Sequence, residues 1–316
     1  MSLKYFYHRG LHPKMHTPSS SQGIIDRTQL VLPDSRVAIH TPIGRVGAAP
    51  KTIEELFHER VMQITAAAHG AKIVVLWSGG IDSTAILTAF LLHGERERVV
   101  VMCNEYSVDE YPEFYANHIH GKLPTIPLDF HNPNPFLPYL GTHVFVTGNC
   151  FDEVFGDPLY EALSEIDLRM STETLFKLPN VRASWARLVE ASPVELVDVR
   201  DLLWWKNYAL DYQLDQMQWC LYDERLRLEH NLFHFCDTQD WNDYAVNTPT
   251  SVKWGGSVAA HKYKDPLRRY IKQFTGDSVY EATKRKQISM RRYRTTHQRA
   301  LLPAAIDETW RRCYAI

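Results

Sequence analysis

The chain has 316 residues, enough for one large domain or two ordinary ones with a buried core. Apolar residues make up 45% and charged residues 23%, the usual mix for a soluble globular protein. The net charge of −2 excludes an overall attraction to nucleic acid or anionic lipid. No apolar run approaches the roughly 18 residues that a membrane-spanning helix needs, so no membrane partner is expected.

Cysteine and histidine spacing excludes the common structural metal sites. The five cysteines are odd in number, none forms a C-x-x-C pair, and no signal peptide opens the sequence. A reducing, cytoplasmic setting is therefore expected. His118 and His120 lack nearby thiols at ligand spacing, which argues against structural zinc.

The first elements are an irregular leader and a helix. Residues 1–52 are rich in proline and serine and contain only short β-prone pieces. Thr52 and Glu55 have the spacing of a capping box, and apolar residues then recur at helical spacing to residue 68. The sequence predicts a helix that starts after Thr52.

Alternating strands and helices follow. The apolar runs predict strands at 72–77, 99–103, 125–130 and 143–147, and helices at 83–92 and 111–120. Continuous apolar strands separated by helices indicate an α/β fold with a doubly wound parallel sheet. From about residue 157 onward the pattern is helical. We expect a leader at 1–52, an α/β core at 53–160 and a helical C-terminal region at 161–316.

The last third of the chain is locally basic. Residues 261–300 contain twelve Lys or Arg against three acidic residues, a local charge of +9. Tyr263, Tyr270 and Tyr293 are interleaved with these charges. Such a segment could follow a nucleic-acid backbone, or it could be a solvated face.

The stretch Ser78-Gly79-Gly80-Ile81-Asp82-Ser83 connects the first strand to the next helix. A glycine pair in that place can be a plain turn. Here it precedes a helix N-terminus whose N–H groups attract anions, and two serines add hydroxyl donors. Asp82 beside a phosphate needs a bridging cation, which suggests Mg²⁺. The loop lacks both the Gly-Lys-Ser/Thr of a Walker A motif and a G-x-G-x-x-G pattern.

S-G-G-I-D-S resembles the pyrophosphate-binding loop of the N-type ATP pyrophosphatases, also in its place after the first strand. The resemblance implies an adenine nucleotide alpha hydrolase-like fold, with ATP and Mg²⁺ bound at an ATP-binding core. These enzymes cleave ATP between the α and β phosphates and attach AMP to a carboxyl or carbonyl oxygen. It further places adenine on main-chain groups near Trp77 and Met102.

A second motif lies at 143–158, where "TGNCFDEVFG" is similar to the second signature of the asparagine synthetase synthetase domain. The resemblance implies ATP contacts from Thr147 and Gly148 and a second Mg²⁺ carboxylate from Asp152. Carboxylates that follow two parallel strands would point into one crevice. Asn149 stands where the family has an acid. We take it as a catalytic position whose side chain can orient a substrate but cannot accept a proton.

A third, weaker match joins "HKYKDPLRRYIKQF" and the residues after it to the family's closing signature. The match implies that Lys286 is the catalytic lysine that neutralises charge on the acyl-adenylate and pyrophosphate. It makes Arg268, Lys284 and Arg285 the next candidates.

Together these motifs predict an ATP-dependent, AMP-forming amide ligase. It would adenylate a small-molecule acceptor with a carboxylate and transfer it to ammonia or an amine. No glutaminase half precedes the motifs, so ammonia would be free or come from a separate partner. The short segment 104–141 and Asn149 argue against aspartate as acceptor. Two alternatives stay open: a nucleic-acid-modifying enzyme that uses 261–300, and a non-catalytic nucleotide-binding protein. The sequence leaves the oligomeric state unknown.

Overall fold

The computed structural model describes residues 26–28, 30, 41–129, 135–156, 169–177, 179–213, 216, 225–228, 230–255 and 263–284. Its strands are β1 (Lys72–Leu76), β2 (Val99–Cys103), β3 (Thr125–Pro127), β4 (His143–Thr147) and β5 (Leu232–His234). The helices up to β4 are α2 (Ile53–Ala67), α3 (Ile81–His93), α4 (Glu105–Glu110) and α5 (Pro112–Phe114). After β4 come α6 (Phe151–Phe155), α7 (Thr172–Leu175), α8 (Pro179–Glu190), α9 (Val199–Leu210), α11 (Gln239–Asn247), α12 (Thr250–Lys253), α13 (Asp265–Thr275) and α14 (Ser278–Thr283).

The five strands form one parallel sheet in the order β3-β2-β1-β4-β5, so the predicted α/β fold is present. Every residue of β2 is buried, as a strand covered on both faces requires. This arrangement is compatible with a doubly wound sheet. Within the described part of the chain, no helix is long and apolar enough to cross a membrane.

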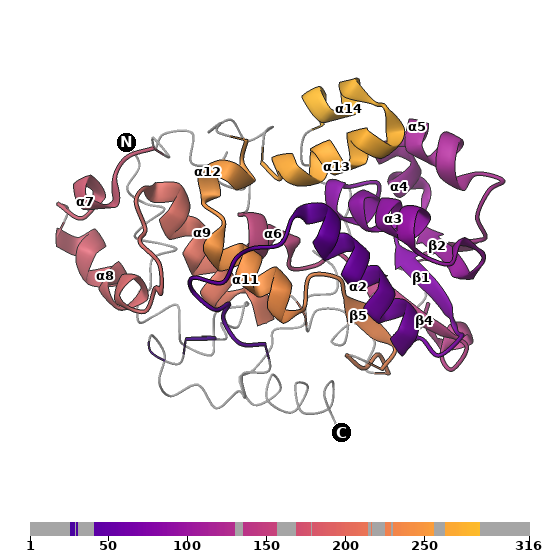
Figure 1. Cartoon of the computed structure of the whole chain (residues 1–316), viewed down its shortest axis with the longest axis horizontal. Coiled ribbons are helices and arrows are strands. Elements are labelled where there is room, and N and C mark those ends of the chain that lie inside the picture. Colours follow the sequence, from indigo (N-terminus) through magenta and orange to yellow (C-terminus); the bar gives the residue numbers. More distant parts are fainter. Residues whose placement is uncertain are drawn as a thin grey trace.

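One face of the sheet is covered by α2, α3 and α13, which pack against one another in Figure 1. Their shared core includes Ile73 and Val75 of β1 and the rings of Phe57 and Tyr270, which stack with centroids 4.6 Å apart. The predicted capping box at the start of α2 is present, with Thr52 and Glu55 bonding to each other's backbone N–H.

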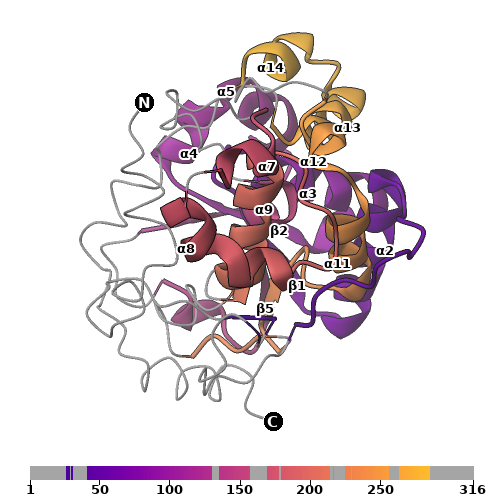
Figure 2. The same ribbon diagram turned by 90° about the vertical axis from the view of Figure 1, so that its left-hand side faces the viewer.

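A second group of helices lies beside the sheet. In Figure 2, α7, α8 and α9 face the viewer. The C-terminal end of α9 also contacts the predicted leader, at residues 26–28. The N–H of Arg27 donates to the Ala209 carbonyl, and its guanidinium donates to the carbonyl oxygens of Thr41, Pro42 and Tyr208.

Two predicted elements differ from the structure. The expected helix at 111–120 starts at Pro112, because Tyr111 departs from helical geometry and separates it from α4. It then runs as α5 directly into a π-helical turn at Tyr115–Ile119. β5 falls in the region predicted to be wholly helical. Its three residues are strand because they pair with β4, a contact across more than 80 residues that local spacing does not encode.

Candidate active site at the carboxyl edge of the sheet

The predicted loop and the second motif lie side by side because of the strand order. β1 and β4 are neighbours, and the chain order reverses between them. In open α/β sheets this reversal leaves a crevice beyond the carboxyl ends of the two strands. Loop 77–80 leaves β1 into α3, and turn 148–150 leaves β4 into α6, so both motifs open into that crevice.

Asp82 and Asp152 converge on a single atom. They lie in the first turns of α3 and α6, where acids also favour the positive end of the helix dipole. Lys264 Nζ is 2.6 Å from both carboxylate oxygens of Asp82 and 2.6 Å from Oδ1 of Asp152. The two motifs, 70 residues apart in sequence, are thus joined by an ammonium group.

Lys264 is buried between partly exposed acids. Its side chain is 0% exposed, whereas each of the two carboxylate side chains is 28% exposed. Burial lowers the pKa of Lys264, but the charges of Asp152 and Asp82 outweigh it and raise the pKa above the usual lysine value. Two carboxylates and one ammonium leave the cluster with a net charge of −1.

Sequence reasoning missed Lys264. The residue begins the K-x-x-L-R pattern of the closing motif, and that was the signal that could have identified it. Among the described residues it is also one of three non-glycine residues with positive φ, at 55°, immediately before α13. A left-handed lysine costs conformational energy, so it persists where the surroundings fix it.

The two serines of the loop bond to each other and to the loop backbone. Ser83 Oγ accepts from the Ser78 N–H at 3.0 Å and lies 3.1 Å from Ser78 Oγ. The Gly80 N–H donates to Ser78 Oγ at 3.3 Å. Both hydroxyls therefore line the inside of the turn, and contact with a phosphate would replace some of these bonds.

Gly79 and Gly148 allow close packing around the carboxylates. Gly79 has a φ of 75°, and a Cβ there would lie 2.3 Å from the Ser107 carbonyl oxygen of α4. A Cβ on Gly148 would lie 2.9 Å from the Asp82 Cβ. Gly148 thus brings the two motifs within reach of one cation. Gly79 has a structural reason to be glycine besides the predicted room for pyrophosphate.

The helices α3, α6 and α13 all begin at this cluster without a side-chain cap. Among the other described helices, α2, α4, α7, α9, α11 and α14 begin with a capping side chain, whereas α5 and α12 do not. The first N–H groups of a helix need partners, and an anion can supply them. The helix starts that meet at the cluster are therefore suited to phosphate.

Thr147 and Asn149, the residues predicted to contact ATP and the acceptor, form a turn at the end of β4. Thr147 Oγ1 donates to Asn149 Oδ1 at 3.2 Å and accepts from the Asn149 N–H at 3.3 Å. Cys150 follows with a φ of 76°, a conformation that favours glycine. The tight turn holds the Asn149 side chain next to the end of β4.

The predicted adenine contacts are occupied in part by the protein itself. The N–H of Trp77 donates to the Met102 carbonyl at 2.9 Å, and the indole Nε1 donates to Thr84 Oγ1 at 3.1 Å. Both side chains are almost completely buried. Adenine binding at the ends of β1 and β2 stays a prediction. It would need main-chain groups other than the Trp77 N–H and the Met102 carbonyl, which bond to each other.

A second lysine lies near the loop. Lys284 Nζ is 3.0 Å from Glu110 Oε1, and both side chains are buried. Glu110 borders Gly79 and Gly80, since its atoms would be the neighbours of a Cβ at either position. Lys286, the predicted catalytic lysine, and Arg285 lie outside the described residues.

Arg268 fixes the positions of both lysines. Its guanidinium donates to the carbonyl oxygens of Tyr263, Glu281 and Lys284 and is itself fully buried. It therefore acts as a scaffold between the start of α13 and the end of α14.

The described part of the basic segment is engaged in the fold. Lys264, Arg268 and Lys284 are buried, Arg269 pairs with Asp265, and Lys272 pairs with Glu281. The rings of Tyr263 and Tyr270 are also buried, so neither offers a stacking surface. The other seven basic residues and Tyr293 lie outside the described residues, and nucleic-acid binding through 261–300 stays a prediction.

The donor set fits a magnesium ion held jointly with a nucleotide. In proteins Mg²⁺ is commonly bound by one or two carboxylates and completed by phosphate oxygens. Asp82 and Asp152 supply that pair, already directed at one cation. Among the described residues no group of three or more His, Cys, Asp or Glu could hold a metal alone. The protein thus offers two carboxylates and would leave the other ligands to the nucleotide.

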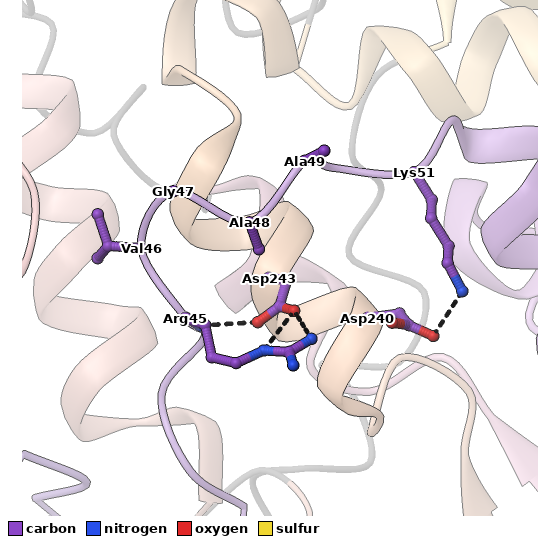
Figure 3. A pocket seen from close by; sticks show the side chains of 8 residues that line it. All are labelled: Arg45, Val46, Gly47, Ala48, Ala49, Lys51, Asp240 and Asp243. Atoms are coloured by element: carbon purple, nitrogen blue, oxygen red, sulfur yellow. Dashed lines mark hydrogen bonds and ion pairs between the residues drawn. The ribbon is translucent and has the colours of Figure 1, made fainter.

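Two surface hollows lie apart from this cluster. Figure 3 shows one of about 470 Å³, where Arg45 pairs with Asp243 and Lys51 pairs with Asp240. Its charged side chains pair with one another within the protein.

The other hollow, of about 500 Å³, lies past the carboxyl ends of β2 and β3 and is lined by residues that include Asn104 and Tyr115. It shares the sheet edge with the carboxylate pair and offers room for an organic group.

Comparison of the chain with protein-family models gives no match. A sequence comparison with curated proteins gives none either, so the resemblance stands on the motifs alone.

Proposed function

We propose that this protein is an ATP-dependent ligase that forms AMP and pyrophosphate while joining a carboxylate to ammonia or an amine. The observation that carries the proposal is the convergence of Asp82 and Asp152 at the switch point of the sheet. They lie beside a serine-glycine loop and uncapped helix starts, a combination suited to a nucleotide with its metal.

Each group has a role in binding the triphosphate. The first N–H groups of α3 and the hydroxyls of Ser78 and Ser83 bind the β and γ phosphates, the part that leaves. Lys264 holds the carboxylates in register. When bound between these carboxylates and the phosphates, Mg²⁺ would neutralise charge on the departing pyrophosphate.

The reaction proceeds in two displacements. A carboxylate oxygen of the acceptor attacks the α-phosphorus, the bond to the β-phosphate oxygen breaks, and pyrophosphate leaves. The nitrogen of ammonia or an amine then attacks the acyl carbon, AMP leaves with the bonding electron pair, and the nitrogen loses a proton. Asn149 positions the acceptor by hydrogen bonding and takes no proton, because an amide is not a base at neutral pH.

The first experiment identifies the products. Protein is incubated with Mg²⁺, ATP labelled at the α-phosphate, pooled carboxylic acids and ammonium. We expect labelled AMP, with turnover stimulated by one class of acceptor. Labelled ADP in place of AMP would contradict the proposal.

Variants test the site itself. Asp82→Asn and Asp152→Asn each keep the size of the side chain but remove a charge, and we expect AMP formation to fall at least about a hundredfold. Asp240→Asn is the matched control, since Asp240 pairs with Lys51 on the surface, away from the crevice. Full activity in Asp82→Asn would refute the assigned role.

A further inference from the structure

The atom on which Asp82 and Asp152 converge belongs to the protein. Lys264 Nζ contacts both carboxylates at 2.6 Å and is closed off from solvent. We propose that Lys264 is an internal cation that excludes free divalent metal from the Asp82–Asp152 pair, so that metal enters only together with phosphate. The proposal rests on the proposed function for its nucleotide but concerns the metal affinity of the nucleotide-free protein.

Charge is the first reason. Without Lys264 the pair would present two negative charges, a strong site for a divalent cation. With Lys264 the net charge is −1, and a divalent ion at the same oxygens lies a few ångströms from a fixed positive charge. A nucleotide's phosphates restore the missing negative charge and supply the remaining oxygen ligands.

The second reason is that the Lys264 side chain cannot easily move away from the two carboxylates. Its side chain is fully buried, its backbone is held in the left-handed region, and α13 starts at the next residue. Arg268 binds the carbonyl of the adjacent Tyr263 at 2.9 Å and anchors the turn. An exposed lysine could swing into water when a metal arrives, but this one is fixed.

The third reason is the direction of the acids. Asp82 and Asp152 keep 28% of their side-chain surface exposed, while the lysine between them has none. The ammonium therefore contacts the carboxylates from the protein side. A metal carried by a phosphate can approach from the crevice side without removing the lysine.

The test measures Mn²⁺ binding by electron paramagnetic resonance in the absence of nucleotide. Lys264→Gln removes the charge and retains N–H donors for the carboxylates. We expect this variant to bind Mn²⁺ at least about tenfold more tightly than the wild type. Lys253→Gln is the matched control: Lys253 is equally buried, but its Nζ contacts the Ala245 carbonyl and no carboxylate of the pair, so the Mn²⁺ binding of this variant should equal that of the wild type.

Equal Mn²⁺ affinity in wild type and Lys264→Gln overturns the proposal. A second measurement needs no variant: with the metal excluded, the melting temperature of nucleotide-free wild-type protein should not rise with Mg²⁺ up to about 10 mM. A clear rise overturns the proposal even if Lys264→Gln does not fold. Neither readout involves turnover, so an inactive protein that passes both refutes the ligase and leaves the exclusion standing.

Discussion

Two fully buried lysines, one in each half of the structure, have opposite surroundings. At the sheet edge, Lys264 lies between the carboxylates of Asp82 and Asp152. Among the helices beside the sheet, Lys253 donates to the Ala245 carbonyl at 2.6 Å and lies 3.9 Å from the centre of the Trp204 ring. Burial lowers the pKa of Lys253 well below its usual value, whereas the carboxylates raise that of Lys264.

The difference lies in whether the buried lysine has a charged partner. A buried charge is tolerated when it is paired, and the pair then becomes costly to break from either side. The Lys264 cluster therefore keeps three charges at the crevice. Around Lys253 lie the Ala245 carbonyl and the Trp204 ring, and burial outweighs the charge of Asp201, so the environment favours the uncharged amine.

The largest expected effect is on stability. Lys264→Met leaves two carboxylates without their cation, and we expect it to lower the free energy of unfolding by about 3–5 kcal/mol. Lys253→Met keeps an unbranched stem against Trp204 and loses one hydrogen bond, so we expect a loss of about 1–2 kcal/mol. Urea unfolding followed by circular dichroism measures both. Equal losses would remove the distinction between the two lysines.

A buried histidine extends the comparison to acid pH. His234 on β5 donates from Nε2 to the Gln216 carbonyl at 2.8 Å, and burial lowers its pKa to about 4. The unfolded chain binds the proton near pH 6.5, so the histidine's contribution to stability is present above that pH and is lost as the pH falls toward 4. We expect about 3 kcal/mol to disappear between pH 7 and pH 4 through this group.

The control for this prediction is His234→Gln, which keeps an N–H donor but has no proton to gain. Its free energy of unfolding should fall less steeply with acid than that of the wild type. Parallel acid titrations of the two proteins would show that His234 is not the responsible group.

Two glycine substitutions distinguish a packed from an open glycine turn at the sheet. Gly79 and Gly141 both have positive φ, at 75° and 86°, but only Gly79 would place a Cβ against other atoms. Gly141→Ala should cost about 1 kcal/mol, the left-handed backbone alone. Gly79→Ala should cost about 2–3 kcal/mol more because α4 must shift. If thermal unfolding shows equal costs, α4 does not pack on the loop as described.

The strands were predictable where local pattern decides the structure. β1, β2 and β4 follow continuous apolar runs, and their bounds agree with the prediction to within one residue. β3 ends at Pro127, three residues before the predicted end. β5 was missed because an aromatic-rich segment becomes a strand only through pairing with β4.

The sequence predicted the two acidic residues of the candidate site but not the lysine between them. Asp82 and Asp152 each follow a strand, so a parallel sheet alone places them at one edge. Lys264 follows no strand, and its approach depends on how α13 packs against α2 and α3. Composition identified the basic segment but could not show that Lys264, Arg268 and Lys284 are turned inward.

The guanidinium of Arg268 has one more consequence. It bonds to the chain before α13, within α14 and directly after α14. The two helices are thereby joined into one unit, with Lys264 at its start and Lys284 at its end. The ring of Tyr280 in α14 stacks on Tyr111, with centroids 4.1 Å apart, and attaches α14 to the segment between α4 and α5. Because Arg268 bonds to the chain beside each lysine, removing its guanidinium would loosen the Lys284–Glu110 pair and the Lys264–aspartate cluster together.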